Sequence, residues 1–210
     1  MAAEQGQDHG HDHPPRSDHP VRAWEKREAA IRSLLIEKGL LTADAIRAKI
    51  EEWEQKSPAL GARIVARAWS DPAFEARLLA DANEAAGELG IEARGVKIVA
   101  LKNTPRLHHL VVCTLCSCYP RALLGLPPAW YKAPAYRSRA VSEPRAVLAE
   151  FGTRLPPETE VRVVDSTADC RYLVLPVRPA GTEGWSEDRL AGLIGRDAMI
   201  GVAVVQAARA

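Results

Sequence analysis

The chain has 210 residues, of which 47% are hydrophobic and 26% are charged, and these values are ordinary for a globular protein. Its formal net charge of +1 provides no strong electrostatic attraction for nucleic acid or acidic lipid, so we expect neither kind of partner. No run approaches about 18 consecutive apolar residues, and the polar start Met1–Asp18 has no apolar signal core, so the sequence predicts a cytoplasmic protein without a membrane span.

Residues 1–22 form a distinct polar segment that contains four of the six histidines, His9, His11, His13 and His19. Aspartates and prolines separate these histidines, and such a composition cannot bury a core. The segment is therefore predicted to be a disordered tail. Two interpretations remain open for it: a merely solvated tail, or a weak site for metal capture or delivery.

Helical periodicity dominates residues 23–90. The first predicted helix spans residues 23–38, a second begins after the capping residue Thr42, and two more cover residues 62–69 and 71–89. The first two helices are amphipathic, and no following segment is an obvious packing partner for them. They are expected either to form an arm that grips another subunit or to fold back on their own domain.

The pattern changes after Gly95, where short apolar runs separated by turn residues replace the helical spacing. The expected strands cover residues 96–101, 107–112, 161–165 and 171–176, and two helices are expected at 145–151 and 186–194. Residues 91–210 are therefore predicted to form a compact α+β domain behind a helical N-terminal half.

Three of the four cysteines fall within the six residues 113–118, which we call the claw. Cysteines this close in sequence are poor partners for a structural disulfide, so the cluster indicates metal or redox chemistry. The spacing C-x-x-C brings the sulfurs of Cys113 and Cys116 to one side of a turn. The following C-x-C places the amide nitrogens of Ser117 and Cys118 between two sulfurs, so the loop can offer three sulfurs and two nitrogens to one ion.

Such a five-donor site favours low-spin Co³⁺ or Fe³⁺, because binding through a deprotonated amide requires a strongly polarising metal. It leaves one octahedral position open. The alternative is a tetrahedral zinc site, which would need a fourth ligand from His108, His109 or Cys170. If the five-donor site is correct, the two histidines are not ligands and Cys170 is a packing residue.

Residues 112–120 resemble the metal loop of nitrile hydratase α subunits, and Thr114 and Tyr119 resemble the cobalt type within that family. The likeness covers about residues 24–205 and is carried by these further blocks: Leu60–Ala62, Ala68–Pro72, Leu124–Lys132, Tyr136–Val141, Glu143–Arg145, Asp165–Thr167, Arg171–Tyr172, Arg178–Glu183 and Met199–Val202. It implies an α+β fold in which a helical N-terminal arm, residues 23–90, contacts a partner subunit and precedes a layered α-β-β-α catalytic domain, residues 91–210.

The resemblance also implies the chemistry of the site. One Co(III) per chain, with iron fitting less well, is held by Cys113, Cys116, Ser117 and Cys118, and the last three of these are the catalytic residues. Cys116 is expected as sulfinic acid and Cys118 as sulfenic acid. Their oxygens are held by arginines of a β subunit, in an αβ heterodimer or α2β2 assembly. The reaction is hydration of a small nitrile to its amide, with either sulfenate or metal-bound water as nucleophile. A separate accessory protein is expected to load the cobalt.

The chain departs from the family pattern at three positions. Arg121 stands where a tryptophan usually lines the substrate pocket, Arg94 stands where a glutamine is usual, and Asp169 replaces a glutamate. The resemblance implies that Asp165, Asp169 and Arg171 lie in the segment that contacts the arginines of the β subunit. The two arginines also resemble the γ subunit of thiocyanate hydrolase, so thiocyanate is the alternative substrate to a nitrile, and a non-catalytic zinc-binding module is a second alternative.

Overall fold

The structure is a computed structural model that describes residues 23–207. The predicted histidine-rich tail therefore lies outside the described residues. Among the helices that the structure describes, none is long and apolar enough to cross a membrane.

Contacts between residues divide the chain into two compact units, with the boundary between Lys49 and Ile50. The first unit contains α1 (Ala23–Glu37) and the start of α2 (Ala43–Glu54), and neither helix has a buried residue. The hydroxyl of Thr42 accepts a hydrogen bond of 3.0 Å from the amide of Ala45, so the predicted N-cap of α2 is confirmed.

The next helices of the N-terminal half are α3 (Pro58–Ser70), α4 (Pro72–Ala80) and α5 (Ala82–Glu88). The single helix expected over residues 71–89 is interrupted at Asp81. The carboxylate of Asp81 accepts hydrogen bonds from the amides of Asn83 and Glu84, which caps a new helix start. The carboxylate of Asp71 caps α4 in the same way.

Helices α3 to α5 are part of the second unit and bury their apolar faces in its core. Ile64 and Val65 of α3 and Phe74 and Leu78 of α4 are at most 1% exposed. The boundary between compact units therefore falls well before the boundary expected near residue 90. Periodicity indicated helical structure here, as two helices rather than the three observed, but could not indicate what their apolar faces pack against.

Four strands lie at the centre of the second unit: β1 (Lys97–Lys102), β2 (Leu107–Val112), β3 (Glu160–Asp165) and β4 (Cys170–Leu175). β1 pairs in parallel with β4, and β2 pairs in parallel with β3. A turn closed by the bridge between Thr104 and Leu107 joins β1 to β2. The predicted strands agree with the observed ones to within a residue at each end.

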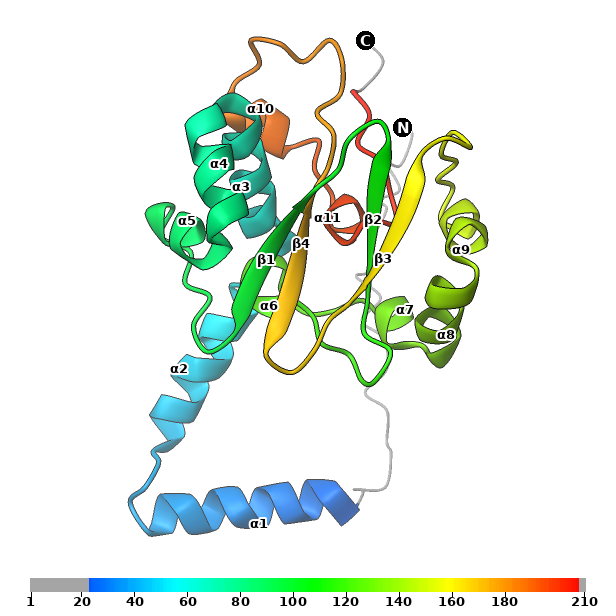
Figure 1. The fold of residues 1–210 in the computed structure, drawn as a ribbon. Helices are drawn as coiled ribbons and strands as arrows, with labels where there is room; N and C mark the ends of the chain where they lie inside the picture. Colours follow the sequence, from blue (N-terminus) through cyan, green and yellow to red (C-terminus); the bar gives the residue numbers. More distant parts are fainter. Residues whose placement is uncertain (1–22, 208–210) are drawn as a thin grey trace, which may run out of the picture. The chain divides into compact units, whose positions relative to one another are not determined.

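Helices lie on both outer sides of these strands (Figure 1), which confirms the predicted α+β class. α4 and α5 contact β1, whereas α8 contacts β2 and α9 contacts β3. The helices of the C-terminal half are α6 (Arg121–Leu124), α7 (Ala129–Lys132), α8 (Pro134–Ser142), α9 (Pro144–Glu150), α10 (Glu187–Ala191) and α11 (Arg196–Ile200).

A buried polar network ties β2 to the end of α11. The Nε2 atom of His108 lies 2.7 Å from the carbonyl oxygen of Gly201, so Nε2 carries the proton and Nδ1 accepts from the Asn103 amide at 3.2 Å. Asn103 Oδ1 in turn accepts from the backbone amide and Nδ1 of His109, at 2.8 and 3.0 Å. Both histidines are neutral core residues in this arrangement, consistent with the expectation that neither ligates a metal. Gly201 has a φ of +87°, and a Cβ there would collide with the His109 carbonyl.

This network predicts a stability that depends on pH near neutrality. Burial lowers the pKa of His108 and of His109 below the ordinary value of 6.5. The unfolded chain therefore binds more protons below about pH 6.5, and the free energy of unfolding falls as the pH decreases, by at most about 1.4 kcal/mol per pH unit for each histidine. Urea denaturation of the metal-free chain between pH 8 and pH 5 measures this. A variant that starts at residue 23 lacks the other four histidines and should keep the same dependence, and a flat profile would contradict the prediction.

Candidate metal centre

The claw begins where two parallel strands end. Val112 is the last residue of β2 and pairs with Asp165, the last residue of β3. The amide of Ser166 donates a hydrogen bond of 2.7 Å to the carbonyl of Val112 and extends this pairing by one residue. The claw thus leaves the sheet at a fixed point, beside the carboxylate of Asp165.

The three claw thiols converge. The sulfurs of Cys113 and Cys116 are 3.5 Å apart, those of Cys116 and Cys118 are 3.2 Å apart, and all three lie within 4.8 Å of one another. Cys113 is buried, Cys118 is partly buried and Cys116 is exposed. Three soft sulfur donors at these separations can hold one thiophilic ion, so the residues fit the metal expected from the sequence.

Electrostatics divides the charge unequally among the thiols. Hydrogen bonds from the thiols of Cys118 and Cys113 lower the pKa of Cys116 to about 7. Burial, followed by the hydrogen bond to Cys116, raises the pKa of Cys118 to about 12. The exposed Cys116 therefore loses its proton more readily than Cys118, and a thiolate is the form that binds metals.

Asp165 holds the first half of the claw from the β3 side. Its carboxylate accepts a hydrogen bond of 3.0 Å from the amide of Thr114 and a second from the Thr114 hydroxyl. The amide of Cys116 donates to the sulfur of Cys113 at 3.2 Å. Side chain and backbone thus keep the C-x-x-C turn closed.

Helices α7 and α8 contribute three donors, of which two reach the claw and one reaches β2 just before it. The hydroxyl of Tyr131 donates to the carbonyl of Cys118 at 2.8 Å, and the hydroxyl of Tyr136 donates to the carbonyl of Val111 at 2.7 Å. Arg137 Nη1 donates to the carbonyl of Cys116 at 2.9 Å.

Arg137 was assigned no role from the sequence, although it lies in the block Tyr136–Val141 that resembles the family. Its contact with the claw crosses 21 residues of sequence. The contact depends on how α8 docks on β2, which helical periodicity does not reveal.

The remaining predicted site residues divide into two groups. Arg171 lies close enough to Cys118 for its positive charge to oppose the rise of that pKa, and Asp165 touches the claw directly. In contrast, Arg94 is largely exposed and pairs with Glu92 at 2.9 Å.

Among the described hydrogen bonds and ion pairs, none joins the other members of the second group to the claw. Asp169 is exposed, and its carbonyl accepts from Lys97 at the start of β1. Cys170 is a partly buried free cysteine outside the sulfur cluster. Arg121 is exposed at the first position of α6, three residues after Cys118.

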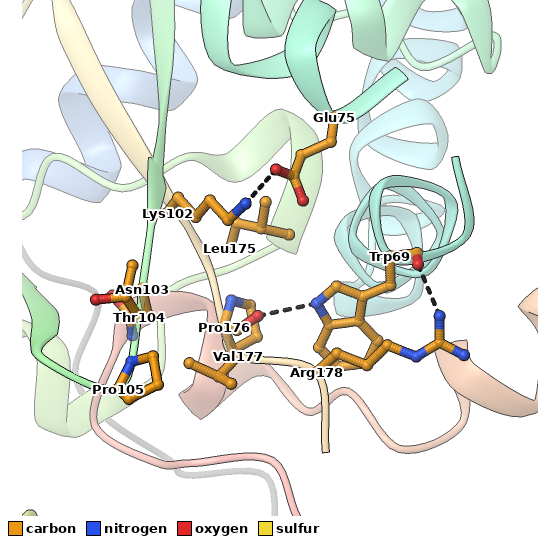
Figure 2. Close-up of a pocket in the computed structure, with 10 residues that line it drawn as sticks. All are labelled: Trp69, Glu75, Lys102, Asn103, Thr104, Pro105, Leu175, Pro176, Val177 and Arg178. Carbon is orange, nitrogen blue, oxygen red and sulfur yellow. Dashed lines mark hydrogen bonds and ion pairs between the residues drawn. The ribbon is translucent and has the colours of Figure 1, made fainter. Parts of the chain in front are cut away.

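A separate hollow of about 340 Å³ lies at the carboxyl ends of β1 and β4 (Figure 2). Its charged and polar groups form an ion pair and hydrogen bonds within the lining. Lys102 pairs with Glu75, Arg178 donates to the carbonyl of Trp69 at 2.7 Å, and the indole of Trp69 donates to Pro176 at 2.9 Å. This hollow offers no cluster of metal ligands comparable to the claw.

The hydrogen bonds of Asp165 predict a direct effect on metal binding. Asp165→Ala removes the two carboxylate oxygens that accept hydrogen bonds from Thr114. The metal-free claw then loses part of its fixed geometry. We expect the affinity for Co²⁺ to fall about tenfold, since hydrogen bonds to a charged group contribute about 1.5–3 kcal/mol. Competition with a chromophoric chelator measures the affinity. Asp169→Ala is the matched control and should stay within about twofold; equal effects in the two variants would contradict the role given to Asp165.

Known proteins resemble this chain over most of its length. It is 53% identical over 192 residues to the low-molecular weight cobalt-containing nitrile hydratase subunit alpha of Rhodococcus rhodochrous, covering 90% of this chain and 91% of that one. It is 45% identical over 196 residues to thiocyanate hydrolase subunit gamma of Thiobacillus thioparus, covering 88% and 81%. A solved histidine double mutant of the Fe-type nitrile hydratase from Comamonas testosteroni Ni1 matches with a TM-score of 0.80 and 43% identity, covering 88% and 91%.

A family model described as the nitrile hydratase alpha chain matches residues 22–203. This match includes the claw, both pairs of strands and the helices that hold the claw. The chain therefore belongs to the nitrile hydratase alpha-chain family.

Proposed function

We propose that this chain is the metal-bearing α subunit of a nitrile hydratase, which adds water across the C≡N bond of a nitrile to give the amide. The convergence of three sulfurs within 4.8 Å, in a chain of this family, carries the proposal. The proposed ligands are the sulfurs of Cys113, Cys116 and Cys118 and the amide nitrogens of Ser117 and Cys118.

The proposed metal is one trivalent cobalt per chain. The name of the Rhodococcus rhodochrous relative records cobalt, whereas the solved Comamonas structure is of the iron type. Thr114 and Tyr119 support cobalt, because both resemble the cobalt type of claw. When bound, the ion supplies Lewis acidity toward a nitrile or a water molecule.

The burial of the three thiols supports the oxidation states implied by the resemblance. Oxidation of cysteine follows thiolate character and exposure. Cys116 is exposed and has the lowered pKa, Cys118 is partly buried with a raised pKa, and Cys113 is fully buried. This order supports sulfinic acid at Cys116, sulfenic acid at Cys118 and an unmodified thiolate at Cys113.

The oxygens added to Cys116 and Cys118 are acceptors that need positive donors. Arg171 provides positive charge near Cys118. We propose that a β subunit provides the remaining donors as arginines. The assembly is then an αβ heterodimer or its α2β2 dimer, and it acts in the cytoplasm after an accessory protein has loaded the cobalt.

The first two helices support this partner. No residue of α1 or α2 is buried, although both helices carry large apolar side chains. Trp24 and Ile31 of α1 are about 60% exposed, and Ile50 of α2 is 52% exposed. Exposed apolar surface of this extent is typical of an interface, so we propose that these helices are the arm that contacts the β subunit.

Replacement of the claw cysteines tests the metal site. We expect Cys113→Ser, Cys116→Ser or Cys118→Ser to abolish both cobalt binding and nitrile hydration in the assembled complex. Cys170→Ser is the matched control and should retain both. Metal analysis of the wild type should give about one cobalt per chain, and mass spectrometry of the claw peptide should give about three added oxygens, two on Cys116 and one on Cys118. Zinc with unmodified thiols would instead support a non-catalytic zinc-binding module.

Thiocyanate hydrolysis is the second candidate function. Two observations favour it: the exposed Arg121, three residues after Cys118 in the chain, whose fixed charge attracts anions, and the 45% identity to a thiocyanate hydrolase subunit. The higher identity to the cobalt-containing nitrile hydratase subunit favours a nitrile as the substrate of this chain.

An assay with both substrates separates the candidates. We expect the complex to hydrate a small aliphatic nitrile, with thiocyanate acting as a competitive inhibitor held by Arg121. Arg121→Trp should weaken that inhibition about tenfold, the effect of losing roughly 1.4 kcal/mol of ionic attraction, and leave inhibition by a neutral nitrile analogue within about threefold. A complex that turns over thiocyanate alone would refute nitrile hydration as its function.

A further inference from the structure

Arg137 is placed at the claw by an anchored helix. α8 contacts β2, and the hydroxyl of Tyr136 fixes it there through the carbonyl of Val111. The next residue, Arg137, donates from Nη1 to the carbonyl of Cys116 at 2.9 Å and makes a longer contact of 3.5 Å with the carbonyl of Thr114. Both acceptors belong to the claw backbone.

The guanidinium of Arg137 is committed to the claw. In the part of the chain that the structure describes, no carboxylate forms an ion pair with it. Its Nε is buried and has no hydrogen-bond partner. Leaving a buried donor unpaired costs about 1–3 kcal/mol of stability. The hydrogen bonds of Arg137 therefore do not by themselves account for the position of its guanidinium beside the claw backbone.

The oxygen that Arg137 contacts belongs to a particular peptide bond. The carbonyl of Cys116 and the amide nitrogen of Ser117 are the two ends of one planar, conjugated unit. When Ser117 nitrogen binds a metal, its N–H bond breaks, the proton passes to water, and the freed electron pair forms the bond to the metal. The negative charge left on the peptide is shared with the Cys116 oxygen, where a guanidinium stabilises it by a charge-assisted hydrogen bond.

The other hydrogen bonds to the claw do not reach a ligand peptide in this way. Tyr131 donates to the carbonyl of Cys118, but the nitrogen of that peptide belongs to Tyr119, which is not a ligand. Asp165 binds the amide and hydroxyl of Thr114, before the first ligand nitrogen. Among the described hydrogen bonds, Arg137 alone brings a positive charge to the oxygen of a peptide whose nitrogen is a proposed ligand.

We propose that Arg137 is a positioning residue of the metal centre: its guanidinium holds the oxygen of the Cys116–Ser117 peptide and stabilises the Ser117 nitrogen as a metal ligand. The inference rests on the proposed function, because it assumes the claw with two backbone nitrogens. Charge supports it, since three anionic sulfur groups and two deprotonated amides exceed the charge of a trivalent ion by about two, and this side chain supplies one compensating charge from within the chain.

The test compares three variants of the assembled, cobalt-loaded complex. Arg137→Gln removes the charge, and Arg137→Lys keeps it but loses the planar guanidinium. Arg139→Gln is the matched control, because Arg139 lies on the same helix and pairs with Glu150 on the surface at 2.6 Å. The rate of cobalt release to excess chelator and the sulfur-to-cobalt absorption band are recorded for each, together with melting temperatures with and without cobalt.

We expect Arg137→Gln to release cobalt at least about tenfold faster than the wild type and to shift the absorption band. Arg137→Lys should show a smaller increase of about threefold, and Arg139→Gln should stay within about twofold. The rise in melting temperature caused by cobalt should shrink in Arg137→Gln while the metal-free melting temperature stays near that of the wild type. A purely structural role would lower both melting temperatures equally.

Two outcomes overturn the inference alone: release of cobalt from Arg137→Gln at the rate of Arg139→Gln, or an equal loss of melting temperature with and without cobalt. If Arg137→Gln does not assemble, Arg137→Lys decides, and wild-type release and absorption in that variant refute the inference. A wild-type complex that contains no cobalt would refute the proposed function and the inference together.

Discussion

The parallel pairing of β2 with β3 fixes where the metal loop begins, and the rest of the site is arranged around that point. Val112 and Asp165 are register partners at the last positions of β2 and β3. The segments that follow these two strands therefore leave the sheet at the same end. The Asp165 carboxylate then lies within hydrogen-bond distance of Thr114, two residues beyond Val112. Because side chains alternate between the faces of a strand, a shift of register by one residue would turn Asp165 away from the claw.

A loop that ligates through its own backbone must already be ordered, because each free dihedral angle lost on binding weakens the affinity. The claw is ordered by contacts from elements distant in sequence. Asp165 holds its start, Arg137 holds the peptide in its middle, and Tyr131 holds the carbonyl at its end. The sulfurs therefore lie within 4.8 Å of one another, and burial of Cys113 anchors one of them in the core.

How much of the fold and of the metal site could be predicted depends on whether a feature is encoded by residues that are neighbours in the sequence. The strands and the C-x-x-C-x-C spacing are contiguous signals, so they were read from the sequence nearly residue by residue. Helices α6 and α7 were missed because residues 119–134 are rich in proline and give no helical period. The core position of α3 to α5 and the contact of Arg137 were missed for a different reason: each depends on which surface a helix packs against, and periodicity contains no such information.

The two sides of the claw differ in what protects them. The inner side is held by the strands and by α7 and α8, whereas Cys116 is exposed and Leu115, a large apolar residue between two ligands, is 89% exposed. An apolar side chain at the tip of a metal loop is stabilised only when another surface covers it. This division separates two tasks. In the proposed complex, residues of this chain position the metal from the inside, and the β subunit covers Leu115 and Cys116. Arg121, exposed three residues after Cys118, is the residue through which the proposed function distinguishes a neutral nitrile from an anion.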